Sequence, residues 1–299
     1  MKWILIANPI AGHGRCAREI DAAYRLLHTK GVAADLVLTG MPGDGMRQGR
    51  LAAEKGYRGI VVAGGEGTVN EVINGLASVA DTREFTLATL PLGTSNSFLR
   101  DFSLREVDDA VDRIASGLAA PCDLLECTLA VAGEPVRRLV LNNIIVGFGA
   151  DVGNFMNRRL KFLGHRGYSL GVAVQVIRLH RPEMCIEVDG KPVSQCYTMI
   201  NVGNSQYTGG TMRISPTSKV DDGLLEVLSV YRLSRMELIR AFPKIFTGDH
   251  LGHKKIRVEQ GRSVGITCEL PLPVLIDGDI LGATPMHVTV LPNAIRFVR

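Results

Sequence analysis

Apolar runs and helical patterns alternate along the first part of the chain, up to about residue 122. Each of four short apolar runs precedes a stretch with the period of an amphipathic helix. The apolar runs are Trp3–Ala7, Leu36–Thr39, Gly59–Ala63 and Thr86–Leu90. The helical stretches are Cys16–Lys30, Gly45–Lys55, Val69–Val79 and Glu106–Gly117. This alternation predicts a doubly wound α/β domain with a parallel sheet over residues 1–122.

The pattern changes after residue 122, where apolar and polar residues alternate with a period of two. Such segments are CIEVDGKPV, LLEVLSVY, KIRVEQ, VGITCE, VLIDGDIL and HVTVLP. The first contains Asp189-Gly190, a dipeptide that favours a tight hairpin turn. We therefore predict a mostly antiparallel β domain over residues 123–299, with helices near Gly167–Leu179 and Ser234–Phe246. Whether the last residues pack back on the first domain is left open.

Composition narrows the class of protein but names no partner. The chain has 299 residues, of which 46% are hydrophobic and 21% charged, as in an ordered soluble protein. Its 34 basic and 30 acidic residues give a net charge of +4, too small a surplus to indicate nucleic acid. No apolar stretch approaches the roughly 20 residues of a membrane span, so membrane contact would be peripheral.

The cysteines favour a reduced, cytoplasmic protein. They form no CxxC pair and no Cys/His cluster with zinc spacing, so we expect buried thiols and no structural zinc. The six are Cys16, Cys122, Cys127, Cys185, Cys196 and Cys268.

Three glycine-rich turns in the α/β half could bind phosphate. The first, GHGRCA at Gly12–Ala17, fits a dinucleotide fingerprint with Asp35 downstream as a ribose ligand. However, Asp35 precedes the apolar run LVLT instead of ending it, so the alternative is a plain strand-to-helix turn. The other two turns are VVAGGEGTVNEVINGL at Val61–Leu76 and LPLGTSNSF at Leu90–Phe98. Both follow parallel strands, so they would converge at the carboxyl edge of the sheet.

Together these motifs resemble the bacterial branch of the diacylglycerol kinase catalytic-domain superfamily, a distant relative of the NAD kinases. The resemblance runs nearly end to end, through NPIAG, GGEGTVNEV, LPLGTSNSF, GGTMRISPTSKVDDGLLEV and IDGD. It implies an ATP- and Mg²⁺-dependent lipid kinase. It also implies that the second domain is a β-sandwich, and that the active site lies in the cleft between the domains.

The resemblance also implies the site residues. The nucleotide contacts would be Asn8, Thr39, Gly64, Gly65, Glu66, Gly67, Thr68, Asn70, Glu71, Gly93, Thr94 and Asn96. The metal ligands would be the Asp222 carboxylate and the main-chain carbonyls of Lys219 and Leu224. Asp279 would be the catalytic base, with Asp277 as its local rival. The alternative, from the residues alone, is that Asp222, Asp277 and Asp279 only shape hairpin turns.

Glu66 raises a question, because a carboxylate in a phosphate-binding turn would repel the anion. It becomes tolerable if Mg²⁺ lies between the two, so we expect Glu66 to bind the metal or its water. The alternative is an acid that only stabilises the helix dipole. Relatives usually have Asp at the position of Glu66. Ser97 stands where many relatives have Asp, and Asp279 stands where they usually have Glu.

Two alternatives to a lipid kinase therefore remain. One is a weakly active or inactive nucleotide-binding regulator, which fits the three altered acidic positions. The other is a kinase of a soluble acceptor such as NAD, because NAD kinases share the acidic glycine turn.

A basic segment without acids indicates where a membrane would be met. Between Arg158 and Arg181 lie six Lys and Arg residues, interleaved with Phe162, Leu163, Tyr168 and Leu170. The six are Arg158, Arg159, Lys161, Arg166, Arg178 and Arg181. This mixture is typical of an element that lies on an anionic membrane surface, the alternative being a solvated helix. A homodimer is left open by the sequence.

Overall fold

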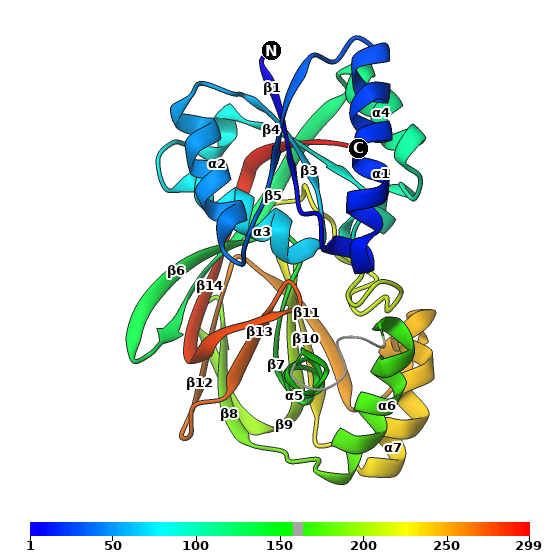
Figure 1. Cartoon of the computed structure of the whole chain (residues 1–299). Coiled ribbons are helices and arrows are strands. Elements are labelled where there is room, and N and C mark those ends of the chain that lie inside the picture. Colours follow the sequence, from blue (N-terminus) through cyan, green and yellow to red (C-terminus); the bar gives the residue numbers. More distant parts are fainter. Residues whose placement is uncertain (158–163) are drawn as a thin grey trace. The chain divides into compact units, whose positions relative to one another are not determined.

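The computed structural model describes residues 1–157 and 164–299, without the side chains of residues 164–170. The chain forms two compact units (Figure 1). Unit 1 contains Met1–Asp123 together with Pro292–Arg299, and unit 2 contains Leu124–Leu291. The predicted order, an α/β unit followed by a mostly antiparallel β unit, is confirmed.

Unit 1 is built on a parallel sheet in the order β2-β1-β3-β4. Its strands are β1 (Trp3–Ala7), β2 (Ala34–Leu38), β3 (Gly59–Ala63) and β4 (Thr86–Leu90). Strands β3 and β4 are buried along their whole length, which explains their continuous apolar sequences. The strand order reverses direction between β1 and β3, so this sheet has a topological switch point there.

Four helices cover the two faces of this sheet. They are α1 (Ala11–Thr29), α2 (Asp44–Glu54), α3 (Glu66–Ala77) and α4 (Val107–Ser116), with 3-10 turns at Thr82–Glu84 and Phe98–Phe102. Helices α1 and α4 lie together on one face, and α2 and α3 on the other (Figure 1). A Cβ on Gly75 would come within 2.1 Å of the Met46 carbonyl oxygen, so α2 and α3 pack backbone against backbone.

The chain returns to unit 1 at its end. Strand β14 (Asp279–Val298) finishes parallel to β4, with Arg296 opposite Thr86 and Phe297 opposite Leu87. Phe297 is fully buried, and its ring lies 4.9 Å from that of Phe98. The last residues therefore extend the sheet of unit 1.

Unit 2 is antiparallel throughout its described pairings. Its strands are most of β5 (Ala119–Val131), β6 (Glu134–Val140), β7 (Asn143–Gly147), β8 (Glu183–Val188), β9 (Lys191–Gly203), β10 (Leu225–Tyr231), β11 (Ile256–Gly261), β12 (Ser263–Cys268), β13 (Pro273–Ile276) and most of β14. The pairings close a ring in the order β9-β7-β13-β14-β12-β8 and back to β9. The ring closes because the long strands β9 and β14 each pair with two different sets of neighbours.

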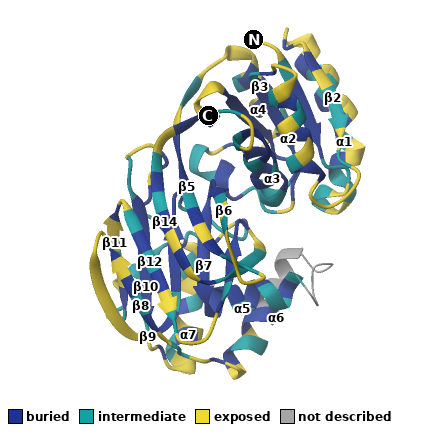
Figure 2. Cartoon of the chain, turned by 90° about the vertical axis from the view of Figure 1, so that its left-hand side faces the viewer, coloured by how far each residue is buried: buried dark blue, intermediate teal, exposed yellow. Residues whose placement is uncertain are grey.

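Two large apolar cores hold the described part of unit 2 together, beside a smaller cluster of Ile145, Ala150, Ile214 and Leu275. The first fills the ring and includes Val146, Tyr197 and Val264; Figure 2 shows the buried residues of these strands in dark blue. The second lies between the strands β10 and β11 and the helices α5 (Phe148–Phe155), α6 (Gly164–Ile177) and α7 (Arg235–Ala241). Short 3-10 turns follow α7 at Phe242–Phe246 and Asp249–Gly252.

The helices depart from the sequence prediction in two places. Helix α5 was not expected, and the segment predicted as one helix over 234–246 is α7 followed by a 3-10 turn. Helix α1 is interrupted at Gly12, His13 and Gly14, which adopt left-handed conformations, and the regular helix after them agrees with the predicted start at Cys16. Within residues 1–157 and 164–299, no helix is long and apolar enough to cross a membrane.

Candidate active site

The glycine turn after β3 presents an open backbone at the start of α3. Gly65 has an extended conformation, and a Cβ placed on it would meet no described atom within 4 Å. Gly64 differs, because a Cβ there would lie 2.8 Å from the Thr68 side chain. Gly64 is thus required for packing, whereas Gly65 leaves room beside the N–H groups of the helix start, which attract anions.

Asn8 ties this turn to the switch point. Its N–H donates to the Ala63 carbonyl at 2.8 Å, and its side-chain amide donates to the Thr68 hydroxyl at 3.0 Å. Thr68 is buried in the first turn of α3. The carboxyl ends of β1 and β3 are therefore held together where open α/β sheets bind their ligands.

The glycine turn after β4 packs against the first one. A Cβ on Gly93 would come within 2.6 Å of the Gly64 carbonyl oxygen, so only glycine permits this approach. Asn96, at a φ of 49°, accepts a hydrogen bond from the Gly93 N–H and donates one to the Gly93 carbonyl, each 3.1 Å long. Thr94 is exposed at the tip of this turn. The structure therefore brings the two glycine turns together.

Glu66 bridges the two turns. Its Oε1 accepts a hydrogen bond of 2.5 Å from the N–H of Ser97, which is fully buried after the second turn. Glu66 itself is half-buried in the first turn of α3, followed by the half-buried Gly67. This contact fixes the carboxylate beside the open backbone of Gly65.

Three other predicted nucleotide contacts belong to the same unit, and each has a hydrogen-bond partner within the fold. Thr39 follows β2 and donates its N–H to the Ala7 carbonyl at 2.8 Å. Glu71 accepts hydrogen bonds from the N–H groups of Gly43 and Gly45, both at 3.0 Å, and so holds the loop before α2. Asn70 is buried in α3, where the Asn74 amide donates to it. Glu71 and Asn70 therefore support the site from within the fold.

The glycine loop after β1, which contains Gly12 and Gly14, packs against another turn of unit 1 and does not fit the predicted dinucleotide fingerprint. A Cβ on Gly12 would lie 2.6 Å from the Leu92 carbonyl oxygen, so this loop leans on the turn after β4. Asp35 lies at the amino end of β2, away from the glycine turns, and accepts a hydrogen bond from the Tyr57 hydroxyl. That placement contradicts the reading of Asp35 as a ribose ligand.

Sequence reasoning missed Arg15, a cation beside the turn after β4. Its guanidinium approaches the Pro91 carbonyl at 3.5 Å and pairs with Glu19 at 2.8 Å. The sequence feature that could have indicated Arg15 is its position directly after the GHG turn.

In unit 2, one hairpin turn separates the two carboxylates of IDGD. Asp277 and Gly278 have φ values of 47° and 95°, as the central residues of a tight hairpin turn between β13 and β14 require. Asp277 is buried and accepts hydrogen bonds from the N–H groups of Leu141 at 3.3 Å and of Asn142 and Asn143 at 3.1 Å. Asp279 is exposed at the first position of β14. Asp277 therefore anchors the hairpin, and Asp279 is the carboxylate presented to solvent.

The predicted metal loop is shaped by its own carboxylate. Asp222 Oδ1 accepts a hydrogen bond of 3.0 Å from the Leu224 N–H, around Gly223 at a φ of 72°. Lys219 and Asp222 are exposed. In the described part of the chain, no three His, Cys, Asp or Glu side chains are grouped to hold a metal ion. The predicted set of one carboxylate and two carbonyls stays a prediction.

A buried acid beside this loop had no signal in the sequence. Glu226, at the start of β10, is 1% exposed, and its Oε2 accepts a hydrogen bond from the Thr217 hydroxyl. Burial raises the pKa of this carboxyl.

Much of the predicted membrane segment lies outside the described residues. This applies to Arg158, Arg159, Lys161, Phe162 and Leu163 and to the side chains of Arg166, Tyr168 and Leu170. Of the remainder, Arg178 is exposed, whereas Arg181 donates to the Leu233 carbonyl at 2.6 Å.

Comparison with known proteins agrees with this architecture. Residues 2–127 match the family described as "Diacylglycerol kinase catalytic domain", and residues 142–299 match the "YegS C-terminal NAD kinase beta sandwich-like domain". A protein of Mycobacterium tuberculosis named diacylglycerol kinase is 26% identical over 100% of this chain and 95% of its own length. One of Bacillus subtilis with the same name is 26% identical over 94% of this chain and 90% of its own.

Solved structures share the fold. The crystal structure of a diacylglycerol kinase from Bacillus anthracis is similar with a TM-score of 0.74 and 24% identity, covering 99% of this chain and 96% of that one. Yeast NADH kinase in complex with NADH is similar with a TM-score of 0.54 and 11% identity, covering 99% and 82%.

Proposed function

Because the chain belongs to the kinase superfamily of diacylglycerol kinase catalytic domains, with a YegS-type C-terminal domain, we propose that it is an ATP-dependent lipid kinase. Its acceptor is a hydroxyl of diacylglycerol or a related lipid. The observation that carries the proposal is similarity along the full chain to proteins named diacylglycerol kinase.

The two joined glycine turns support a nucleotide site in unit 1. The open space at Gly65 is a cradle that a Cβ would fill, and it suits the phosphates of ATP. Glu66, fixed by the Ser97 N–H, would offer the kind of hard oxygen ligand that Mg²⁺ prefers. In unit 2, the Asp222 carboxylate and the main-chain carbonyls of Lys219 and Leu224 would hold a structural Mg²⁺. When bound beside Glu66, Mg²⁺ would neutralise charge on the transferred phosphoryl group.

The exposed Asp279 is the proposed general base. It accepts the proton of the acceptor hydroxyl while the hydroxyl oxygen forms a bond to the γ-phosphorus and the bond to the bridging oxygen of ADP breaks. Asp277 cannot take this part readily, because three N–H groups already occupy its carboxylate. That the acceptor is met in a cleft between the two units stays a prediction.

The test is an assay with γ-labelled ATP, Mg²⁺ and a total lipid extract, with the labelled product identified by mass. We expect label in a phosphorylated lipid with two acyl chains. Label found only when NAD replaces the lipid would identify a kinase of a soluble acceptor, and ATP binding without transfer would identify a regulator.

A further inference from the structure

Helix α7 exposes apolar side chains that the fold of unit 2 does not cover. Met236 and Ile239 of α7 are 56% and 52% exposed, and Phe246 of the following 3-10 turn is 44% exposed. Ile177, at the end of α6, is 72% exposed. With the exposed Arg178, Arg240 and Lys244, these residues are called here the α7 face.

The spacing of α7 explains why these side chains point outward. Leu238 and Ala241 pack into the apolar core beneath the helices. Met236, Ile239 and Arg240 are three and four residues apart, so they share a different side of the helix. The end of α6 joins this side, because the Arg235 guanidinium donates to the Val176 and Ile177 carbonyls at 3.1 and 2.9 Å.

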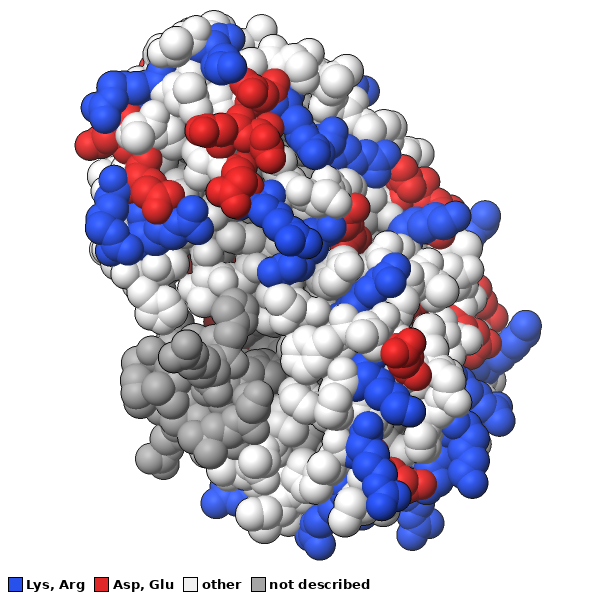
Figure 3. Space-filling view, turned by 90° about the vertical axis from the view of Figure 1, so that its right-hand side faces the viewer, with Lys and Arg blue, Asp and Glu red and all other residues white. Residues whose placement is uncertain are grey.

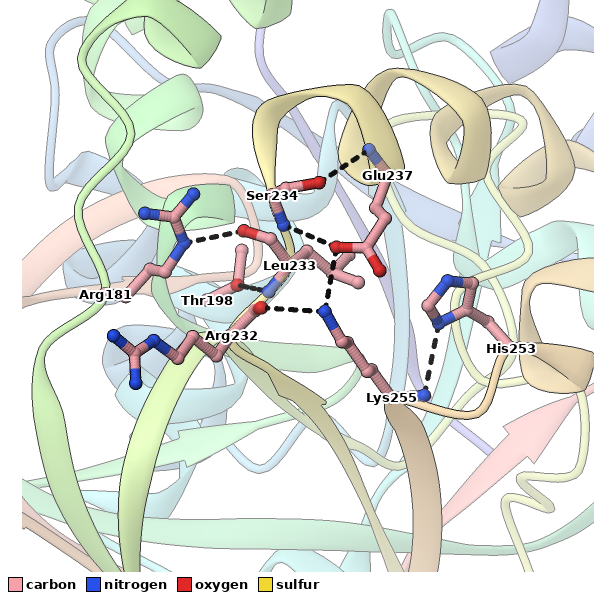
Figure 4. A network of polar contacts seen from close by, with 8 residues as sticks. All are labelled: Arg181, Thr198, Arg232, Leu233, Ser234, Glu237, His253 and Lys255. Carbon is pink, nitrogen blue, oxygen red and sulfur yellow. Dashed lines mark hydrogen bonds and ion pairs between the residues drawn. The ribbon is translucent and has the colours of Figure 1, made fainter.

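A polar network holds α7 in place and neutralises Glu237, the one acidic residue of this helix (Figure 4). Ser234 and Glu237 form a capping box, and Glu237 also pairs with Lys255 at 2.8 Å. Thr198 and Arg181 bind the main chain of Leu233, just before the helix. The carboxylate of Glu237 is thus neutralised beside the start of the helix, and the α7 face stays basic.

The surrounding chain is more basic than the protein as a whole. Between Arg232 and Arg257 lie seven Lys and Arg residues and two acids, Glu237 and Asp249. This surplus of five exceeds that of the entire chain, which is +4. Figure 3 shows the side of unit 2 that carries α6 and α7, where Lys and Arg (blue) cover more of the surface than Asp and Glu (red).

We propose that the α7 face docks unit 2 onto an anionic lipid surface. This inference rests on the proposed function, which requires the enzyme to reach an acceptor held in a bilayer. The exposed apolar side chains enter the interface, and the basic side chains meet the anionic headgroups. A second copy of the chain fits less well, because two copies of a basic face would repel each other.

The test compares vesicle binding of matched variants by co-sedimentation. Vesicles of phosphatidylglycerol and phosphatidylcholine should bind the wild type, and vesicles of phosphatidylcholine alone should bind it weakly.

Arg240→Gln with Lys244→Gln should lower the partition coefficient roughly 30-fold at low salt, since each basic residue contributes about 1 kcal/mol. Met236→Gln with Ile239→Gln should lower it at least about tenfold. Lys191→Gln and Leu270→Gln, at exposed positions outside this face, should leave binding unchanged.

Activity separates this inference from the proposed function. Against short-chain diacylglycerol dispersed without a bilayer, the α7 variants should turn over as fast as the wild type. Vesicle binding that is equal in the wild type and the α7 variants, or absent from the wild type, overturns the docking proposal even if the enzyme is an active kinase. A wild-type dimer that dissociates in the α7 variants, seen by sedimentation velocity, also overturns it. Absence of any lipid phosphorylation, with vesicle binding intact, counts against the proposed function alone.

Discussion

Asp277 and Asp279 are separated by one glycine but lie in different environments, one buried and one exposed. Gly278 at a φ of 95° turns the chain so that Asp277 is buried among three N–H groups, while Asp279 remains exposed. The sequence IDGD predicted a turn because Asp-Gly suits positive φ. It could not predict which carboxylate would be buried, because the N–H groups that hold Asp277 come from residues 141–143.

Replacement of Asp279 by Asn should affect the chemical step alone. We expect kcat to fall by about 10²–10⁴, because the general base is lost, while ATP and lipid binding are kept. Asp279→Glu should retain much of the activity, because it keeps a carboxylate. Steady-state kinetics with separate ATP-binding measurements test this. Near-normal turnover by folded Asp279→Asn would remove the base assignment and direct attention to Glu66.

Replacement of Asp277 by Asn should act on stability instead. Asn tolerates the same positive φ, so the substitution removes mainly the charge that three buried N–H groups contact. We expect the free energy of unfolding in urea to fall by about 2–3 kcal/mol. Asp279→Asn is the matched control, with an expected change within about 1 kcal/mol because that carboxylate is exposed. Equal stability of the two variants would contradict the anchoring role of Asp277.

At the scale of elements, the two glycine turns were predictable and their connections were not. The turns follow buried strands in a recognisable pattern, and parallel strands bring such turns to one edge. The hydrogen bond from Ser97 to Glu66 and those from Gly43 and Gly45 to Glu71 join residues 26 to 31 positions apart. Helix α5 escaped prediction because FGADVGNF is short and contains two glycines, which weaken a helical pattern.

Gly65→Val tests the first glycine turn. The backbone there suits any residue, and a side chain would meet no described atom within 4 Å, so the protein should fold. The added side chain would occupy the space assigned to phosphate, so ATP affinity should fall at least about tenfold. Calorimetric titration with ATP measures this. Gly252→Val, also in open space but in unit 2, is the control. Unchanged affinity in folded Gly65→Val would place the nucleotide elsewhere.

At the scale of the whole molecule, a buried histidine should make stability depend on pH. His250 is 4% exposed, one ring nitrogen lies 3.0 Å from the Ile214 carbonyl, and Nδ1 finds no hydrogen-bond partner among the described residues. Burial lowers the pKa of His250 below its usual 6.5. The unfolded chain therefore takes up the proton first, so stability is complete above about pH 6.5 and declines as the pH falls through the folded pKa.

Urea unfolding between pH 7.5 and 5 measures this contribution. The wild type should lose stability on acidification, by at most about 1.4 kcal/mol per pH unit from this single group. His250→Gln keeps a side-chain donor without titrating, so its profile should be flatter over the same range. Parallel profiles for the two proteins would show that His250 is not the group responsible.

The organisation into an α/β unit and an antiparallel β unit followed from hydrophobic periodicity. The ring closure of unit 2 did not, because it depends on β9 and β14 pairing with different neighbours along their length. Such pairing is decided by tertiary packing, since each half of these strands reads as an ordinary alternating segment.

The transfer of labelled γ-phosphate from ATP to diacylglycerol in mixed micelles tests the central claim most directly. The protein with Mg²⁺ should place the label in the organic-extractable phosphorylated lipid, and Asp279→Asn should reduce that label at least about a hundredfold. Label that remains in ATP, or that appears in a water-soluble acceptor such as NAD while diacylglycerol stays unmodified, would contradict the account.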